Sequence, residues 1–306
     1  LAQAMTPILG QSIIVENRPG AGGMLGTDFG AKAPADGYTL TMATPGTLII
    51  IPAMNRNAKY VTERDFIPIG TVALSSYVVV TANSTDAPQT FQELLTSLKN
   101  KGWIYACGTG HSHMLAEEVF YRAGGFARVR PLLLPKLMLH ESATGSTDEE
   151  RKEGYASLLF QEYEITERDV LIISSNSGRN SVPIELASFA QQKGAKVIVI
   201  TNLAHSQSVS SRHSSGLKLY QLGDVVLDNF GEIGDAALQL EGLNTAIGPT
   251  STVIGTALLQ AILVEATAQL LAQGIVPDIF ASSNSDQGGA HNDALLEAYK
   301  PLVKML

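Results

Sequence analysis

Short apolar runs that alternate with helical stretches in the second half of the chain constrain the fold most strongly. These runs are Ile104–Cys107, Asp169–Ile173, Lys196–Thr201 and Asp224–Asp228. A strand that is apolar along its whole length is buried on both faces, and helices between such strands connect parallel neighbours. We therefore predict an α/β fold with a doubly wound parallel sheet that binds ligands at the carboxyl ends of its strands.

Composition excludes several classes of protein. The formal charge of −8 argues against a general nucleic-acid binder and against a protein of anionic membrane surfaces. The single cysteine, Cys107, excludes an internal disulfide framework and a metal site built from cysteines. The longest apolar stretch, Val253–Ile275, is interrupted by Gln260 and Glu265, and its apolar residues recur at helical spacing. It predicts a core-facing helix rather than a membrane span.

The distribution of charge divides the chain. Residues 1–102 hold seven basic and seven acidic residues, so the remainder carries the whole −8. We predict two domains, 1–101 and 102–306, which meet between an amphipathic helix at Thr90–Lys99 and the first apolar strand. The first domain is expected to be α/β with a mixed sheet. Its expected strands are Ser12–Glu16, Tyr38–Ala43, Phe66–Val72 and Tyr77–Thr81, with a helix at Thr27–Lys32.

The first domain resembles the Bug family, the tricarboxylate-type periplasmic solute receptors of tripartite transporters. The resemblance rests on Gly10–Gly23, Asp36–Leu40 and Asp65–Pro68, which occur in the family's order and cover about residues 1–101. It implies a periplasmic-binding-protein-like α/β lobe. The lobe is expected to be incomplete, because the family's first strand and ligand loop should precede Leu1 and its second lobe does not follow Lys101.

Two polar loops carry the chemistry of the second domain. Gly108–Ser112 and Ser174–Ser181 each follow an apolar strand and precede a helix. Short hydroxyl side chains, backbone N–H groups and a helix N-terminus suit an anionic phosphoryl group. Neither loop has the spacing of a dinucleotide fingerprint or a P-loop. The alternative interpretation is a pair of tight turns that only cap their helices.

The second domain resembles the SIS (sugar isomerase) domains, which bind phosphosugars. The motifs are Gly108–Glu118, Ser175–Asn180, Ser211–Gly216 and Gly248–Thr252, and the resemblance covers about residues 103–306. It implies a flavodoxin-like three-layer fold. The family's opening helical segment is missing, and the helix at Thr90–Lys99 is a candidate replacement. Because the two families occupy different compartments, the chain is expected to be a chimera.

The SIS resemblance implies a phosphosugar site. Arg179 would lie close to the anion as a charge-assisted donor. The residues expected to bind the phosphosugar are Ser112, Ser175, Asn176, Ser177, Gly178, Arg179, Asn180, Thr250 and Ser251.

Candidate catalytic residues are His113, Glu117, Glu118 and His291. His113 and Glu117 are four residues apart on one helix and share a face. Moving a proton between adjacent carbons of a sugar needs an acid–base group with a pKa near neutrality. The alternative to a catalytic role for His113 and Glu117 is an ordinary ion pair on a helix surface. The alternative for His291 is a histidine that is merely exposed on a loop. We predict no metal, since no HExxH spacing occurs, and no cofactor.

The leading hypothesis is therefore phosphosugar binding, with aldose–ketose isomerisation through an enediol as its candidate enzymatic form. The alternatives are a non-catalytic phosphosugar-sensing module and a periplasmic carboxylate receptor. The expected partner is a small sugar phosphate, without nucleic acid or membrane insertion, and homo-oligomers are expected through the SIS domain. The SIS part predicts a cytoplasmic location, whereas the receptor-like part would suggest the periplasm.

Overall fold

The chain divides into two compact units, residues 1–77 and 78–306. The computed structural model describes residues 2–55, 57–70, 72, 90–285 and 288–306, and each unit is considered by itself. The division differs from the boundary at 101 expected from charge. Helix α5 (Thr90–Lys99) belongs to the second unit, because Leu94 and Leu95 are fully buried in its core.

The described residues of the first unit form helices and irregular segments but no strand. The predicted strands at 12–16, 38–43 and 66–72 are therefore wrong for the residues described there, and the one at 77–81 lies outside the described residues. An extended segment needs a paired neighbour for its backbone N–H and C=O groups and a core for its apolar face. Here Ile14, Tyr38 and Ile67 are each about nine-tenths exposed. The helices are α1 (Ala2–Leu9), α2 (Met24–Ala31), α3 (Ile51–Met54) and α4 (Thr62–Asp65).

The second unit is built on a five-stranded parallel sheet with the order β2-β1-β3-β4-β5. This order confirms the predicted flavodoxin-like sheet. One strand, β2, was not predicted, because its sequence Val-Arg-Pro-Leu interrupts the apolar run. The strands are β1 (Ile104–Gly108), β2 (Val129–Leu132), β3 (Val170–Ser174), β4 (Lys196–Thr201) and β5 (Val225–Asp228).

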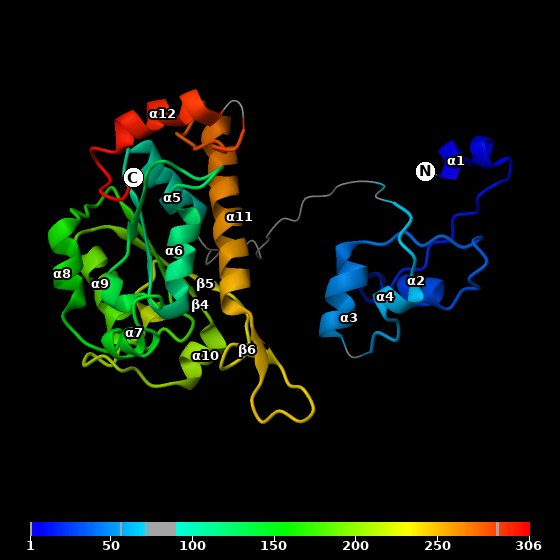
Figure 1. Cartoon of the computed structure of the whole chain (residues 1–306), viewed down its shortest axis with the longest axis horizontal. Helices are drawn as coiled ribbons and strands as arrows, with labels where there is room; N and C mark the ends of the chain where they lie inside the picture. Colours follow the sequence, from blue (N-terminus) through cyan, green and yellow to red (C-terminus); the bar gives the residue numbers. More distant parts are fainter. Residues whose placement is uncertain (1, 56, 71, 73–89, 286–287) are drawn as a thin grey trace. The chain divides into compact units, whose positions relative to one another are not determined.

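Helices cover both faces of the sheet and complete three layers (Figure 1). On one face, α8 (Tyr155–Glu162) and α9 (Ser181–Gln192) pack over Tyr105 and Cys107. On the other, α5, α6 (His113–Val119) and α11 (Ser251–Ala272) pack over Ile104 and Ala106. Because successive side chains of a strand point to opposite faces, an uninterrupted apolar strand supplies both cores.

Shorter elements surround these layers. The β6–β7 hairpin extends away from the sheet beside the start of α11 (Figure 1). The remaining elements are α7 (Ala143–Glu149), α10 (Leu203–Ser208), β6 (Ala236–Leu238), β7 (Ile247–Pro249) and α12 (Gly288–Tyr299).

Helix α11 is long and apolar enough to cross a membrane by length and composition. Core helices of folded domains meet the same criterion, and one face of α11 is buried against the sheet through Leu259, Ile262, Leu263 and Leu270. Its other face leaves an apolar stripe exposed, in which Val253 and Val264 are each about seven-tenths exposed.

The order in which the chain adds strands reverses between β1 and β3: β2 is added on one side of β1, and β3, β4 and β5 are added on the other. The helix after β1, α6, packs on one face of the sheet, whereas the helix after β3, α9, packs on the other. The loops that follow these neighbouring strands therefore separate at the carboxyl edge. In doubly wound sheets such a point is where ligands bind.

Candidate functional site

The loop Ser175–Asn180, which we call the cradle, continues directly from β3 and is fixed to the end of β4. Ser175 N–H donates to the carbonyl of Ile200 at 3.0 Å, and Asn202 N–H donates to that of Asn176 at 3.1 Å. The Thr201 hydroxyl donates to the carbonyl of Ser175 at 2.7 Å. These bonds hold the cradle in one conformation at the carboxyl edge of the sheet.

Gly178 makes the tight turn of the cradle possible. Its φ is +57°, and a Cβ at this position would lie 2.9 Å from the buried Ser206 hydroxyl oxygen. Both the left-handed backbone and the lack of space favour glycine. Its N–H donates to the Ser175 hydroxyl at 3.2 Å.

The cradle presents hydrogen-bond donors without protein partners. The backbone N–H groups of Asn176, Ser177, Arg179 and Asn180 donate to no described residue, and the half-buried Ser177 hydroxyl makes no side-chain hydrogen bond within the described part of the chain. Helix α9 begins at Ser181, so the positive end of its dipole also faces this loop. Successive free N–H groups at a helix N-terminus form a concave anion site.

The loop after β1 lies beside the cradle, because Gly108 and Ser174 are paired in the β1–β3 register. A Cβ on Gly108 would approach the carbonyl oxygen of Ser112 to 2.3 Å, so only glycine allows the chain to fold back here. Ser112 is half-buried and its N–H donates to the carbonyl of Thr109 at 3.1 Å. The structure thus brings Ser112 and the cradle to one edge, as the sequence predicts.

Glu150 joins the two loops, and sequence analysis missed it. Its carboxylate accepts from the Thr109 hydroxyl at 2.6 Å and from the Asn180 amide at 2.6 Å. Burial raises the pKa of Glu150, and the Thr109 hydrogen bond and the charges of Arg151 and Arg212 oppose that shift. A half-buried carboxyl with a raised pKa beside a candidate anion site is a candidate proton carrier.

Arg179 does not take the position expected for it, and a second arginine, Arg212, lies beside the cradle. The Arg179 guanidinium donates to the carbonyl of Ser210 at 2.9 Å, so it holds the segment after α10 instead of pointing to the cradle's free N–H groups. Arg212 donates to the Asn180 side-chain oxygen at 2.8 Å. Burial lowers the pKa of Arg212, and the positive charges of Arg179 and Arg151 lower it further. Positive charge is therefore gathered beside the cradle.

Thr250 and Ser251, two of the residues expected to bind the phosphosugar, lie at the start of α11, and the Thr250 side chain makes no capping hydrogen bond there. Instead, the Asp235 carboxylate accepts from the N–H of Thr250 at 3.1 Å and from that of Ser251 at 2.8 Å. The Ser251 hydroxyl also donates to Asp235 at 2.7 Å. The carboxylate of Asp235 therefore occupies this helix N-terminus, and both the N–H and the hydroxyl of Ser251 donate to it.

The acid–base candidates on α6 separate into two groups. His113 is buried, its Nδ1 donates to the carbonyl of Gly110, and its Nε2 lies 3.5 Å from Glu117 Oε1. The bond to Gly110 fixes the ring so that its Nε2 faces Glu117. Glu118 instead accepts from Arg122 at 2.7 Å and from Gln260 of α11 at 3.2 Å.

Within one chain, His291 does not join this site. It lies in α12, and its Nε2 donates to the carbonyl of Ile279 at 2.8 Å. Ile279 pairs with Phe126, which precedes β2, so His291 is at the amino edge of the sheet. The cradle lies at the opposite, carboxyl edge.

Family models match both parts of the chain. The SIS domain model matches residues 76–202, and the model of the tripartite tricarboxylate transporter family receptor matches residues 1–130. Residues 76–130 are therefore common to both matches. The SIS match begins before α5 and contains both loops of the site, in agreement with the resemblance of the second domain.

Curated relatives match about two thirds of the chain. A UPF0309 protein of Listeria monocytogenes is 46% identical over 210 residues, which are 69% of this chain and 85% of the relative. A UPF0309 protein of Halalkalibacterium halodurans is 47% identical over 203 residues, 66% of this chain and 84% of the relative.

Solved structures are more distant. Phosphoheptose isomerase from Neisseria gonorrhoeae is 19% identical with a TM-score of 0.33, covering 59% of this chain and 83% of that one. The sugar isomerase domain of a transcription factor from Sphaerobacter thermophilus is 12% identical with a TM-score of 0.35, covering 71% and 88%.

Proposed function

The chain belongs to the UPF0309 protein family, and from that premise we propose that its second unit binds a sugar phosphate in the cradle. The free N–H groups of Asn176, Ser177, Arg179 and Asn180, with the Ser177 hydroxyl among them, carry the proposal. A phosphoryl group has enough acceptor oxygens to satisfy them together. The match of residues 76–202 to the SIS domain supports the same ligand class.

The charge around the cradle favours a phosphorylated sugar over a neutral one. The chain as a whole is negative, yet Arg151 and Arg179 lie close enough to Arg212 for their positive charges to lower its pKa. A dianionic phosphate relieves this repulsion, and the neutral part of the sugar would extend toward the loop Gly108–Ser112.

The same site favours isomerisation as the enzymatic form of the proposal. The His113–Glu117 pair sits at the end of the first loop, with His113 Nε2 3.5 Å from Glu117 Oε1. Such a pair is suited to move a proton between adjacent sugar carbons. Binding without turnover would instead identify a sensing module.

The proposal also includes a cytoplasmic location and the formation of homo-oligomers. The exposed apolar stripe of α11 is the proposed contact surface between copies of the chain.

A thermal-shift screen of the purified chain against sugar phosphates and di- and tricarboxylates tests the proposal. A ligand at a hundred times its dissociation constant stabilises a folded unit by about 2.7 kcal/mol. We expect a sugar phosphate to raise the melting temperature of the unaltered chain and of Ser188→Ala, but not of Ser177→Ala. Stabilisation by carboxylates alone, or an undiminished sugar-phosphate shift in Ser177→Ala, would contradict the proposal.

A further inference from the structure

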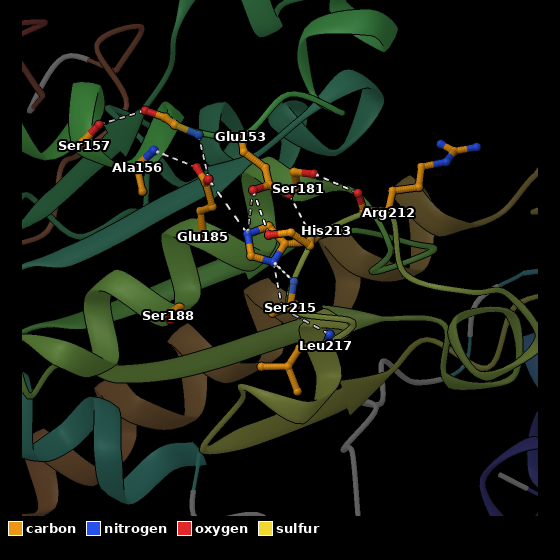
Figure 2. A network of polar contacts seen from close by, with 12 residues as sticks. Glu153, Ala156, Ser157, Ser181, Glu185, Ser188, Arg212, His213, Ser215 and Leu217 are labelled. Atoms are coloured by element: carbon orange, nitrogen blue, oxygen red, sulfur yellow. Dashed lines mark hydrogen bonds and ion pairs between the residues drawn. The ribbon is translucent and has the colours of Figure 1, made fainter.

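Three potential metal ligands from separate segments converge outside the cradle (Figure 2). Glu153 precedes α8, Glu185 lies in α9, and His213 lies in the segment after α10. One ligating atom of each lies within 4.8 Å of the other two. His213 Nε2 is 3.9 Å from an oxygen of Glu153 and 3.9 Å from an oxygen of Glu185.

The cluster has an excess of negative charge. His213 Nε2 lies beyond hydrogen-bond distance of both carboxylates, and the one imidazole can balance at most one of their two negative charges. Arg151 and Lys152 precede Glu153 in the sequence, but they pair with Asp148 and Glu149. No lysine or arginine within the described ranges forms an ion pair with Glu153 or Glu185 in the structure.

Hydrogen bonds already orient each ligand. Glu153 accepts from the N–H of Ser214 at 2.7 Å and from its hydroxyl at 2.9 Å. Glu185 accepts from the N–H of Gly154 at 2.6 Å. His213 Nδ1 accepts from the N–H of Ser215 at 3.1 Å and lies 2.7 Å from the Ser215 hydroxyl oxygen. Binding a cation at Nε2 therefore requires the ring proton to move to Nδ1, where the Ser215 hydroxyl oxygen can accept it. Each carboxylate oxygen keeps a second lone pair, and such outer contacts are typical of metal ligands.

We propose that Glu153, Glu185 and His213 bind a divalent transition-metal ion, with Zn²⁺ as the representative cation. Tetrahedral zinc with ligands at about 2.0–2.2 Å places neighbouring ligand atoms about 3.3–3.6 Å apart. The observed separations are 3.9 Å from His213 to each carboxylate and within 4.8 Å for the whole group, so zinc binding needs side-chain movements. The imidazole favours zinc over magnesium or calcium. A water molecule would complete the coordination.

A cation here would fix the segment that contains His213 to α8 and α9. The same segment supplies Ser210 to Arg179 and Arg212 to Asn180, so it borders the cradle. The inference goes beyond the proposed function and does not depend on it, because zinc binding is measured without any sugar phosphate.

Calorimetric titration of the chelator-treated full chain with ZnCl₂ tests the proposal. We expect one Zn²⁺ per chain, with affinity at least tenfold lower in His213→Ala and in Glu153→Gln. Glu153→Gln keeps the size of the side chain, its oxygen still accepts from the Ser214 N–H, and its amide nitrogen can donate to the Ser214 hydroxyl oxygen, so a fold defect is not expected. His140→Ala removes an exposed imidazole elsewhere and should bind as the unaltered chain does.

Two outcomes would overturn the assignment. One is the absence of zinc binding by the unaltered chain. The other is unchanged affinity in both His213→Ala and Glu153→Gln, which would place the bound ion at another site. Melting curves of the metal-free variants show whether each remains folded, and Zn²⁺ should raise the melting temperature of the unaltered chain more than that of either variant.

Discussion

At the scale of single residues, Glu150 links the folding of the site to pH. Burial raises its folded-state pKa above the ordinary carboxyl value, so the folded chain prefers the protonated form. This contribution to stability is complete below the ordinary pKa and is lost as pH rises through the raised one. Glu150→Gln removes the titration while an amide oxygen still accepts from Asn180. We expect the free energy of unfolding of the unaltered chain to fall relative to Glu150→Gln as pH rises from about 4 to 7.

Denaturation followed by fluorescence measures this difference, since the only tryptophan, Trp103, lies in the second unit. Glu297→Gln, an exposed residue of α12, is the control and should follow the unaltered chain across the pH range. A difference between the unaltered chain and Glu150→Gln that does not change with pH would contradict a raised pKa.

Sequence reasoning found the cradle but not the side chains that support it. Loops of serine and glycine between a strand and a helix follow from local preferences that a sequence displays. Glu150 sits in the charged run Asp148–Glu153, which has the composition of a solvated surface. Its burial depends on Thr109 and Asn180, residues 41 and 30 positions away. The three proposed zinc ligands are similarly dispersed, so no short motif indicates them.

At the scale of elements, α5 has a definite role in the core of the second unit. Leu94 is fully buried among the side chains of the face that also holds α6 and α11. Replacing such a leucine by alanine removes apolar contacts and leaves a cavity, which costs about 2–5 kcal/mol. We expect Leu94→Ala to lower the free energy of unfolding by this amount, measured by denaturation with Trp103 fluorescence. The control Leu40→Ala, at an exposed leucine, should change the free energy of unfolding by less than about 0.5 kcal/mol. Equal effects of the two substitutions would exclude α5 from the core.

The elements that the sequence predicted correctly are those with a strong local pattern. Strands β1, β3, β4 and β5 are nearly continuous apolar runs, and α5 has apolar residues at helical spacing. The failed strands of the first unit have suitable β-branched residues, as in Ser12–Glu16, but no described neighbour pairs with them. Strand formation depends on a partner, which a single segment of sequence does not reveal.

At the scale of the whole molecule, the two units differ greatly in the core that they bury. Among the described residues of the first unit, Thr27 and Tyr60 are buried, whereas the second unit has continuous cores on both faces of its sheet. Burial of apolar area must offset the conformational entropy lost by an ordered chain. The stability measured at Trp103 should therefore come from the second unit, with α5 included.

Fragments of the chain test this division. We expect residues 78–306 to keep the melting temperature reported by Trp103 and any sugar-phosphate shift of the full chain. Residues 102–306 lack Leu94 and Leu95, which cover Ile104 and Val170 on one face of the sheet. We therefore expect this shorter fragment to melt at a lower temperature or to remain unfolded. Equal melting temperatures for the two fragments would place the boundary near residue 101, as the charge pattern alone suggests, and would make α5 an appendage of the first unit.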